Sequence, residues 1–384
     1  MNFENVLNST YTLVLLAVLV LSFLVLCLYY GLTWLRVGRC KKDVVSRQGS
    51  VAAHKPSVSV VMVVHNEAEF LKKSLPYLLE QDYPDFEVVV VNYTSTDDTQ
   101  FVLRVCAENY HNLKPITLKN DVNMFQGRKY PLSIGIKSST KDVVLLTEAE
   151  STPRTFDWIS RMMQGFSGGT QVVIGYNVVK GNGKLLGAFQ QYENMTYNAS
   201  YLGAAMLGNP FTATGRNLSY RRDFFFKQGG FISHYSISDG ADDLFVNQNA
   251  NSRNSALVLS GDAAVYSEAR HSFVTWHQDR VHRLCTRRYY GLKDRLMLLI
   301  YPLSQLLFIV SVVFLFLGQV FPWQILLGVL LLKFLWQIVC SLSLAKKFEI
   351  KKIQFFSPFF EFYFLIANTF LTLFALRRKK KQWR

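Results

Sequence analysis

Cysteine is scarce in this sequence of 384 residues, and its five copies are scattered along the chain. None of them forms the closely spaced pairs of a zinc site, and five in a chain of this length do not indicate a disulfide framework. Acidic residues are also few, with 27 against 42 lysines and arginines, which leaves a formal net charge of +15. Much of the positive charge flanks apolar runs, where it orients a chain in a membrane and attracts anionic lipid. It therefore does not call for a nucleic-acid partner.

Charge is missing almost entirely from two long stretches. No charged residue lies between Glu4 and Arg36, and residues 11–30 are long and apolar enough to cross a bilayer as a helix. This run lacks the basic start and the cleavage site of a signal peptide, so we expect a retained transmembrane helix over residues 1–35. Residues 296–345 are nearly as apolar and predict a transmembrane hairpin.

Lysine and arginine predict how the chain is oriented. They follow the first apolar run and flank the hairpin, which predicts an outside N-terminus and places residues 36–295 in the cytoplasm. Residues 36–56 predict a linker, and residues 276–295 predict a basic helix at the membrane interface. The apolar stretch within residues 346–384 would carry its basic tail outside if it spanned the bilayer, so we expect a re-entrant or interfacial segment. The expected location is the inner (cytoplasmic) membrane, crossed more than once.

The expected cytoplasmic domain, residues 57–275, alternates strands with helices. Its dense apolar runs are typical of strands buried on both faces, at residues 57–64, 86–91 and 143–146. Helical spacing follows the first two, over residues 69–81 and 99–109. This alternation predicts an α/β fold with a mostly parallel sheet, wound by right-handed crossovers and flanked by helices.

Polar side chains follow each of these strands. Glu67 comes after the first strand, Asn92 and Asp97 after the second, and Glu148 and Glu150 after the third. Ligands of parallel sheets bind beyond the carboxyl ends of the strands, so we expect a site at this edge. The last two glutamates are spaced i and i+2, which points both carboxylates to one side of an extended chain and suits Mg²⁺ or Mn²⁺. An exposed acidic turn is the alternative for an isolated Glu-x-Glu.

Together these segments resemble glycosyltransferase family 2, whose members have the GT-A fold. The resemblance covers roughly residues 57–290. It rests on six motifs in the family's order: Val58–Glu67, Val88–Thr99, Leu145–Glu150, Thr214–Arg222, Asp239–Leu244 and Trp276–Arg283. It implies a membrane-bound inverting transferase that moves a sugar from a nucleotide-diphosphate donor, above all a UDP-sugar, to a lipid-linked or glycan acceptor at the cytoplasmic face. A divalent cation, Mg²⁺ or Mn²⁺, is the implied cofactor.

The resemblance also assigns roles to single residues. It implies donor binding by Glu67, Asn92, Tyr93, Asp97, Lys129, Glu148, Arg280 and Arg283. Gly215 and Asn217 would shape the acceptor side, and Glu148 and Glu150 would hold the metal. For the two arginines, a basic helix lying on lipid headgroups is an equal alternative.

The metal and donor motifs depart from the family pattern. Glu148 and Glu150 replace the aspartates of its Asp-x-Asp motif, and the longer side chains move the carboxylate oxygens. Asn92 and Tyr93 stand where the family usually has two aspartates, of which the second binds uracil. A tyrosine can stack on a base but cannot accept its imide proton as a carboxylate does.

The motif for the catalytic base departs as well. Ala241 falls where the family has its catalytic aspartate, so Asp242 or Asp243 is the expected base, with Asp239 as a further candidate. The sequence thus leaves two interpretations open. One is an active transferase, and the other is a catalytically degenerate relative that acts as a membrane partner or regulator in surface-glycan assembly. A glycoside hydrolase, which needs two suitably spaced carboxylates, is a weaker third interpretation.

Overall fold

The computed structural model of the protein describes residues 10–47, 55–118, 127–319, 321–350 and 353–377. The chain divides into two compact units. The first consists of Met1–Arg39 and Gly291–Thr372, and the second of Cys40–Tyr290 and Leu373–Arg384. The end of the predicted basic tail, residues 378–384, lies outside the described residues.

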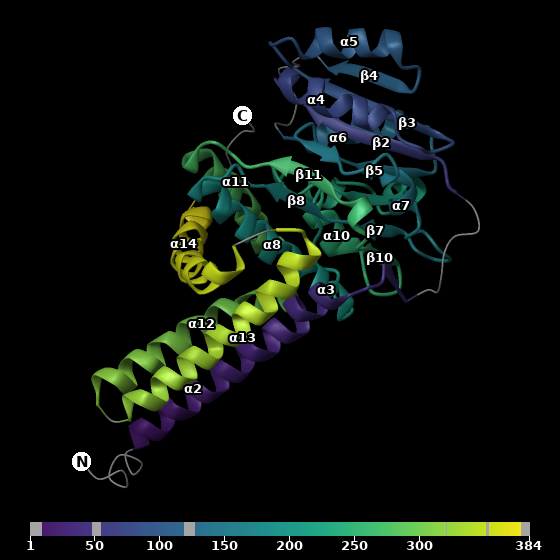
Figure 1. The fold of residues 1–384 in the computed structure, drawn as a ribbon. Helices are drawn as coiled ribbons and strands as arrows, with labels where there is room; N and C mark the ends of the chain where they lie inside the picture. The colour runs from purple at the N-terminus through teal and green to yellow at the C-terminus, as the bar shows by residue number, and fades with distance from the viewer. Residues whose placement is uncertain (1–9, 48–54, 119–126, 320, 351–352, 378–384) are drawn as a thin grey trace. The chain divides into compact units, whose positions relative to one another are not determined.

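The second unit is built on an eight-stranded sheet (Figure 1). In pairing order its strands are β1 (Val44–Ser46), β10 (Ser255–Val258), β7 (Val172–Ile174), β9 (Leu218–Arg221), β5 (Val143–Leu146), β2 (Val58–Val64), β3 (Phe86–Tyr93) and β4 (Leu113–Leu118). Strands β9 and β1 run opposite to the other six. The predicted mostly parallel α/β sheet is confirmed, and the three predicted strands are β2, β3 and β5.

A smaller sheet and, among the described residues, eight α-helices complete this unit. The small sheet has the order β6 (Ser151–Pro153), β11 (Val265–Glu268) and β8 (Asn177–Lys180). The helices are α4 (Ala68–Leu79), α5 (Thr99–Asn109), α6 (Lys129–Ser138), α7 (Trp158–Met163), α8 (Leu185–Met206), α9 (Arg222–Lys227), α10 (Asp243–Asn249) and α11 (Phe273–Thr286). Single 3₁₀ turns form at η2 (Ile232–His234), η3 (Gly261–Ala263) and η4 (Arg287–Tyr289). Helices α4 and α5 lie where the apolar spacing predicted them.

Two segments differ from the expected boundaries. Within the predicted linker, two β-branched valines of β1 pair antiparallel with β10, so the segment adds an edge strand to the sheet. The helix expected over residues 276–295 ends at Thr286, and a new helix begins at Leu292. Between them the Tyr290 side chain is buried and donates its hydroxyl to Asp243, 2.8 Å away, which anchors the turn.

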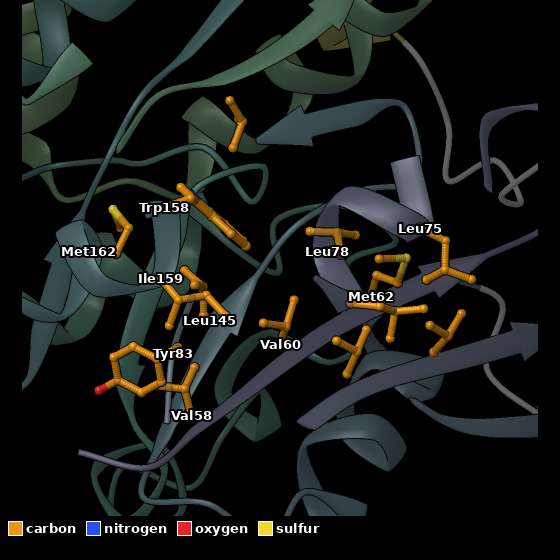
Figure 2. Packing of buried hydrophobic residues seen from close by; sticks show 14 of the residues in the cluster. Val58, Val60, Met62, Leu75, Leu78, Tyr83, Leu145, Trp158, Ile159 and Met162 are labelled. Atoms are coloured by element: carbon orange, nitrogen blue, oxygen red, sulfur yellow. The ribbon is translucent and has the colours of Figure 1, made fainter. Parts of the chain in front are cut away.

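Both faces of the central sheet are covered. One face carries a continuous apolar cluster (Figure 2) that includes Val58, Val60, Met62, Leu75, Leu78, Leu145, Trp158 and Ile159. On the other face α6 approaches so closely that a Cβ on Gly135 would lie 2.8 and 2.9 Å from methyl groups of Val61 and Val91. Burial of each such side chain contributes about 1.5–3 kcal/mol. The core therefore fixes the strand ends, where the polar side chains stand.

The first unit consists of long apolar helices. They comprise α2 (Thr10–Tyr29), the π-helical η1 (Tyr30–Leu35), α3 (Arg36–Arg39), α12 (Leu292–Leu317), α13 (Trp323–Lys347), the 3₁₀ turn η5 (Gln354–Phe356) and α14 (Ser357–Arg377), whose residues from Leu373 on are counted with the second unit. In the described part of the chain, four stretches are long and apolar enough to cross a membrane: Thr10–Arg39, Leu292–Leu317, Trp323–Lys347 and Gln354–Ala375. Helices α2, α12 and α13 lie side by side (Figure 1). The interfacial or re-entrant placement of the last stretch stays a prediction.

A buried polar cluster joins these helices. Lys333 of α13 and Glu361 of α14 form an ion pair with both side chains buried. Tyr30 and Gln305 also donate to Glu361, and Tyr301 donates its hydroxyl at 2.6 Å. A charge at the centre of a membrane helix costs roughly 2.5–3.5 kcal/mol on insertion scales. The pair gives each charge a partner inside the helix bundle.

Candidate active site

The loops after β2 and β3 are tied together at the carboxyl edge of the sheet. Asn66, with a φ of 56°, accepts the N–H of Thr96 on its side-chain oxygen at 2.7 Å. Asp97 accepts the N–H groups of Ala68 at 3.1 Å and Thr99 at 3.0 Å, which begin α4 and α5. Desolvation acts to raise the pKa of Asp97, and the hydrogen bonds together outweigh it and lower that pKa. Both carboxylate oxygens thus accept backbone N–H groups. The donor-binding role of Asp97 stays a prediction.

Asn92 and Tyr93 lie at the end of β3. Asn92 is buried and donates its amide to Gln100 at 2.7 Å, while its side-chain oxygen is buried with no hydrogen-bond partner among the described residues. The ring of Tyr93 meets Tyr130 edge to face, with centroids 6.5 Å apart. A buried acceptor next to an aromatic pair could recognise a nucleobase. The donor-binding roles of both residues stay predictions.

The two glutamates after β5 lie in a chain of ion pairs with three arginines. Arg128 pairs with one oxygen of Glu148, and Arg216 donates Nε to the other at 2.6 Å. Arg216 also donates Nη2 to Glu150 at 3.4 Å, and Arg270 donates Nη1 to the second oxygen of Glu150 at 2.5 Å. We call Arg128, Arg216 and Arg270 the guanidinium cluster.

Strand register explains how two of these arginines reach the glutamates. Leu218 of β9 pairs antiparallel with Leu146 of β5, so Arg216, two residues before β9, lies beside Glu148, two residues after β5. In the small sheet β11 is antiparallel to β6, and it ends beside the start of β6, just after Glu150. The chain leaving β11 therefore brings Arg270 to that glutamate.

Two carboxylates beside the guanidinium cluster differ in their affinity for protons. Burial acts to raise the pKa of Glu148, but Arg128 and Arg216 outweigh it and hold that pKa far below its usual range. Burial raises the pKa of Glu67 from 4.5 to about 7, and the neighbouring Glu150 adds to the rise while Arg128 opposes it. Glu67 thus stands near the cluster, and among the described residues no arginine forms an ion pair with it.

The atoms around Glu148 and Glu150 do not fit a divalent cation. Each of their four carboxylate oxygens is already paired with a guanidinium. Magnesium and manganese sites need oxygen ligands turned towards the ion, and an ion here would face three fixed positive charges. In the described part of the chain, no group of three His, Cys, Asp or Glu side chains could hold a metal. The geometry therefore speaks against the metal role predicted for these glutamates.

Asp242 and Asp243 have different surroundings. Asp243 is buried and accepts hydrogen bonds from the hydroxyls of Thr286 and Tyr290, and burial next to Asp242 raises its pKa. Asp242 is half-buried and accepts the N–H of Gly215 at 2.5 Å, where a Cβ on the glycine would lie 3.0 Å from the same oxygen. Asp243 thus holds α10 in place, whereas Asp242 stands next to the cluster through the Gly215 loop.

The side chains of Lys129 and Asn217 donate hydrogen bonds to backbone carbonyls. The Lys129 amino group is buried and donates to the carbonyls of His234 at 2.7 Å and Ile237 at 3.0 Å, and burial lowers its pKa to about 8. Asn217 is fully buried, donates to carbonyls at 2.9 and 2.8 Å, and accepts from Trp158 at 3.1 Å. These contacts fasten the loops around Asp242. A phosphate contact by Lys129 and an acceptor contact by Asn217 stay predictions.

Arg280 and Arg283 of α11 are both committed to Glu193 of α8. Arg280 lies 3.2 Å from this carboxylate, stacks on Trp276 and is only 2% exposed. Arg283 donates to the same carboxylate at 2.7 Å and is 44% exposed. Burial removes Arg280 from any lipid surface, so the alternative of headgroup contact does not hold for it. The donor-binding roles of both arginines stay predictions.

The guanidinium cluster was not predicted from the sequence, although signals for two of its members stood in the chosen motifs. Arg128 directly precedes Lys129, and Arg216 lies between Gly215 and Asn217. Arg270 had no such signal. It falls between the acidic motif and the last basic motif.

Comparison with known proteins gives a consistent picture. The family model described as Glycosyl transferase family 2 matches residues 59–227. Probable glycosyltransferase YdaM of Bacillus subtilis (strain 168) is 27% identical over 182 residues, which is 46% of this chain and 43% of that protein. Glycosyltransferase AglE of Haloferax volcanii is 28% identical over 190 residues, which is 48% of this chain and 59% of that protein. The chain thus spans about half the length of the curated relatives it matches.

One solved structure is similar over nearly the whole chain. It is the mannosyltransferase PcManGT from Pyrobaculum calidifontis in complex with GDP-Man and Mn²⁺. The TM-score is 0.61, with 19% identity over 94% of this chain and 97% of that one. At this identity the likeness shows the GT-A fold.

Proposed function

Because residues 59–227 match the family model described as Glycosyl transferase family 2, we propose that the chain transfers a sugar, with inversion, from a nucleoside-diphosphate donor to a lipid-linked or glycan acceptor. The observation that carries the proposal is the position of Asp242, a half-buried carboxylate bonded to Gly215, beside the charged strand ends. The raised pKa of Arg128 reflects this closeness: burial lowers it, and Glu148, then Asp242 and Glu67, raise it.

The chemical step uses a base and a charge acceptor. The acceptor hydroxyl oxygen forms a bond to the anomeric carbon while the bond from that carbon to the diphosphate oxygen breaks. Asp242 takes the hydroxyl proton, and the electron pair of the broken bond leaves with the nucleoside diphosphate. Positive groups must lie where that charge develops, since they stabilise the transition state more than the ground state.

The donor and the location are further parts of the proposal. A UDP-sugar is the favoured donor, and a GDP-sugar is the alternative, because the structure with a similar fold is a complex with GDP-Man. The four apolar helices and the flanking lysines and arginines support a multi-pass protein of the inner membrane with its catalytic unit in the cytoplasm. The proposal includes no Mg²⁺ or Mn²⁺ at Glu148 and Glu150, because their carboxylate oxygens are already paired with arginines.

A degenerate transferase that serves as a partner or regulator is the second candidate, and Ala241 at the expected base position favours it. A donor panel separates the two. Full-length protein in lipid nanodiscs is incubated with UDP- and GDP-sugars and a lipid extract as acceptor, and released nucleoside diphosphate is measured. We expect release that depends on both the donor and the lipid extract. Donor binding without release would favour the degenerate relative, and no binding of any donor would refute the proposal.

A further inference from the structure

The guanidinium cluster covers the glutamates that hold it. The side chains of Arg128, Arg216 and Arg270 are 30%, 24% and 33% exposed. Those of Glu148 and Glu150 are 20% and 14% exposed. An anion that reaches this edge from solvent therefore meets guanidinium groups before carboxylates.

Each guanidinium keeps donors that the glutamates do not occupy. Among the described residues, Arg128 gives Nη1 to a carboxylate, Arg216 gives Nε and Nη2, and Arg270 gives Nε and Nη1, the Nε to Asp279. A guanidinium has more N–H groups than these bonds use, arranged in a planar fork that matches phosphate oxygens in pairs. It also stays charged at any physiological pH, unlike histidine or a lysine whose pKa is lowered by burial.

The cluster is placed next to the proposed base. Arg216 directly follows Gly215, whose N–H is bonded to Asp242. The loop that carries Arg216 thus also holds Asp242, the residue before α10, in the same region. Sugar transfer requires this neighbourhood, because the hydroxyl that loses its proton and the diphosphate that leaves flank one carbon atom.

We propose that Arg128, Arg216 and Arg270 bind the donor diphosphate and take up the charge of the departing nucleoside diphosphate in place of a divalent cation. The proposal rests on the proposed function, since it concerns the diphosphate of the same donor. Glu148 and Glu150 are then positioning residues. Through their four oxygens they hold the guanidinium groups apart and oriented, and they coordinate no metal.

Nucleotide binding in the absence of metal tests the proposal. Isothermal titration calorimetry measures the Kd of UDP and of GDP for the full-length protein in buffers with EDTA, with Mg²⁺ or with Mn²⁺. We expect the Kd of the preferred nucleotide in EDTA to lie within about threefold of its value in Mn²⁺, less than 1 kcal/mol of binding free energy. A Kd more than about tenfold weaker in EDTA would overturn the proposal and leave the proposed transfer standing. Failure of both nucleotides to bind in every buffer would refute both.

Variants separate charge from geometry. Arg216→Lys keeps the charge but loses the planar fork, so we expect the Kd in EDTA to weaken by about 10- to 100-fold. The matched control is Arg104→Lys on α5, an exposed arginine stacked on Phe101, which should change the Kd by less than about twofold. Thermal unfolding shows that both variants fold. A folded Arg216→Lys protein that binds as tightly as the wild type would contradict the proposal.

The positioning role of the glutamates can be told from a metal-binding role by comparing nucleotide binding in EDTA and in Mn²⁺. Glu150→Gln weakens the hold on Arg216 and Arg270, so nucleotide binding should fall by the same factor in EDTA and in Mn²⁺. A metal ligand behaves differently, because its loss removes only the part of binding that depends on Mn²⁺. Loss confined to the Mn²⁺ buffer would overturn the assignment.

Discussion

Two neighbouring aspartates, Asp242 and Asp243, should respond in opposite ways to the same substitution. Asp242→Asn removes a base while its amide oxygen can still accept the Gly215 N–H that now lies 2.5 Å from the carboxylate. Loss of a positioned general base lowers kcat by roughly 10²–10⁴-fold. Stability should change by less than about 0.5 kcal/mol, because the backbone contact is retained.

Asp243→Asn is the matched control, one residue away. The Asp243 carboxylate accepts from Leu244 N–H at 2.8 Å with one oxygen, and from Thr286 and Tyr290 with the other. An asparagine can replace only one of these oxygens, and its NH₂ group faces two hydroxyls that now donate. Leaving a buried hydroxyl unsatisfied costs about 1–3 kcal/mol. We therefore expect lower stability with most of the turnover rate retained.

The assay measures the initial rate of nucleoside diphosphate release at saturating donor, with donor Kd and urea unfolding recorded for the same preparations. A transfer rate of Asp242→Asn equal to that of the wild type would refute the reasoning, and Asp239, whose carboxylate lies 3.0 Å from His282, would be the next base to test. Loss of transfer in Asp243→Asn at unchanged stability would likewise refute the structural role. Unchanged donor Kd in Asp242→Asn is expected, because a base acts in the chemical step alone.

Two further predictions concern buried charges. The folded state raises the pKa of Glu67 from 4.5 to about 7, so it binds the proton more tightly than the unfolded chain, and the stability this group contributes at low pH is lost as pH rises through about 7. Glu67→Gln should therefore gain stability relative to the wild type between about pH 5 and about pH 8 in urea unfolding, and a pH-independent difference would contradict this. Lys333→Met leaves Glu361 unpaired and should cost roughly 3–5 kcal/mol, whereas Lys333→Met with Glu361→Leu should recover most of the loss in detergent unfolding experiments. A double variant no more stable than the single one would show that the pair matters through more than charge.

The sheet could be predicted because its central strands β2, β3 and β5 are dense in apolar residues. All seven residues of β2 are buried, so the strand shows as a dense apolar run, and helix α5 (Thr99–Asn109) has the bounds that its spacing indicated. The short strands β6, β7 and β8 gave no comparable signal, because β6 and β7 have only three residues and β8 has polar residues at both ends.

The site could be predicted in its location but not in its partners. Glu67, Glu148 and Glu150 stand at strand ends, and the carboxyl edge of a parallel sheet brings strand ends together. The arginines that pair with Glu148 and Glu150 lie 20 to 120 residues away from them in the sequence, and Glu150 and Arg270 are the pair 120 residues apart. That contact depends on the pairing of β11 with β6. The sequences of such short strands do not show which strands they pair with.

Lys129 shows why residue type alone misleads about role. A lysine near a predicted phosphate site is an obvious candidate ligand. Its amino group instead donates hydrogen bonds to two backbone carbonyls of the second unit. Only the packing of α6 decides which of the neighbours Arg128 and Lys129 turns towards the glutamates.

The ion pair between Lys333 and Glu361 also constrains the order in which the protein is assembled. Glu361 is translated 28 residues after Lys333, which at about 5–20 residues per second is an interval of seconds. During that interval the lysine has Gln337, one turn along its own helix and 2.8 Å away, as its neutral partner. The neutral contact with Gln337 is thus available to Lys333 first, and the docking of α14 adds a charged partner beside it. A nascent chain that ends between these two residues would keep Lys333 without its carboxylate partner.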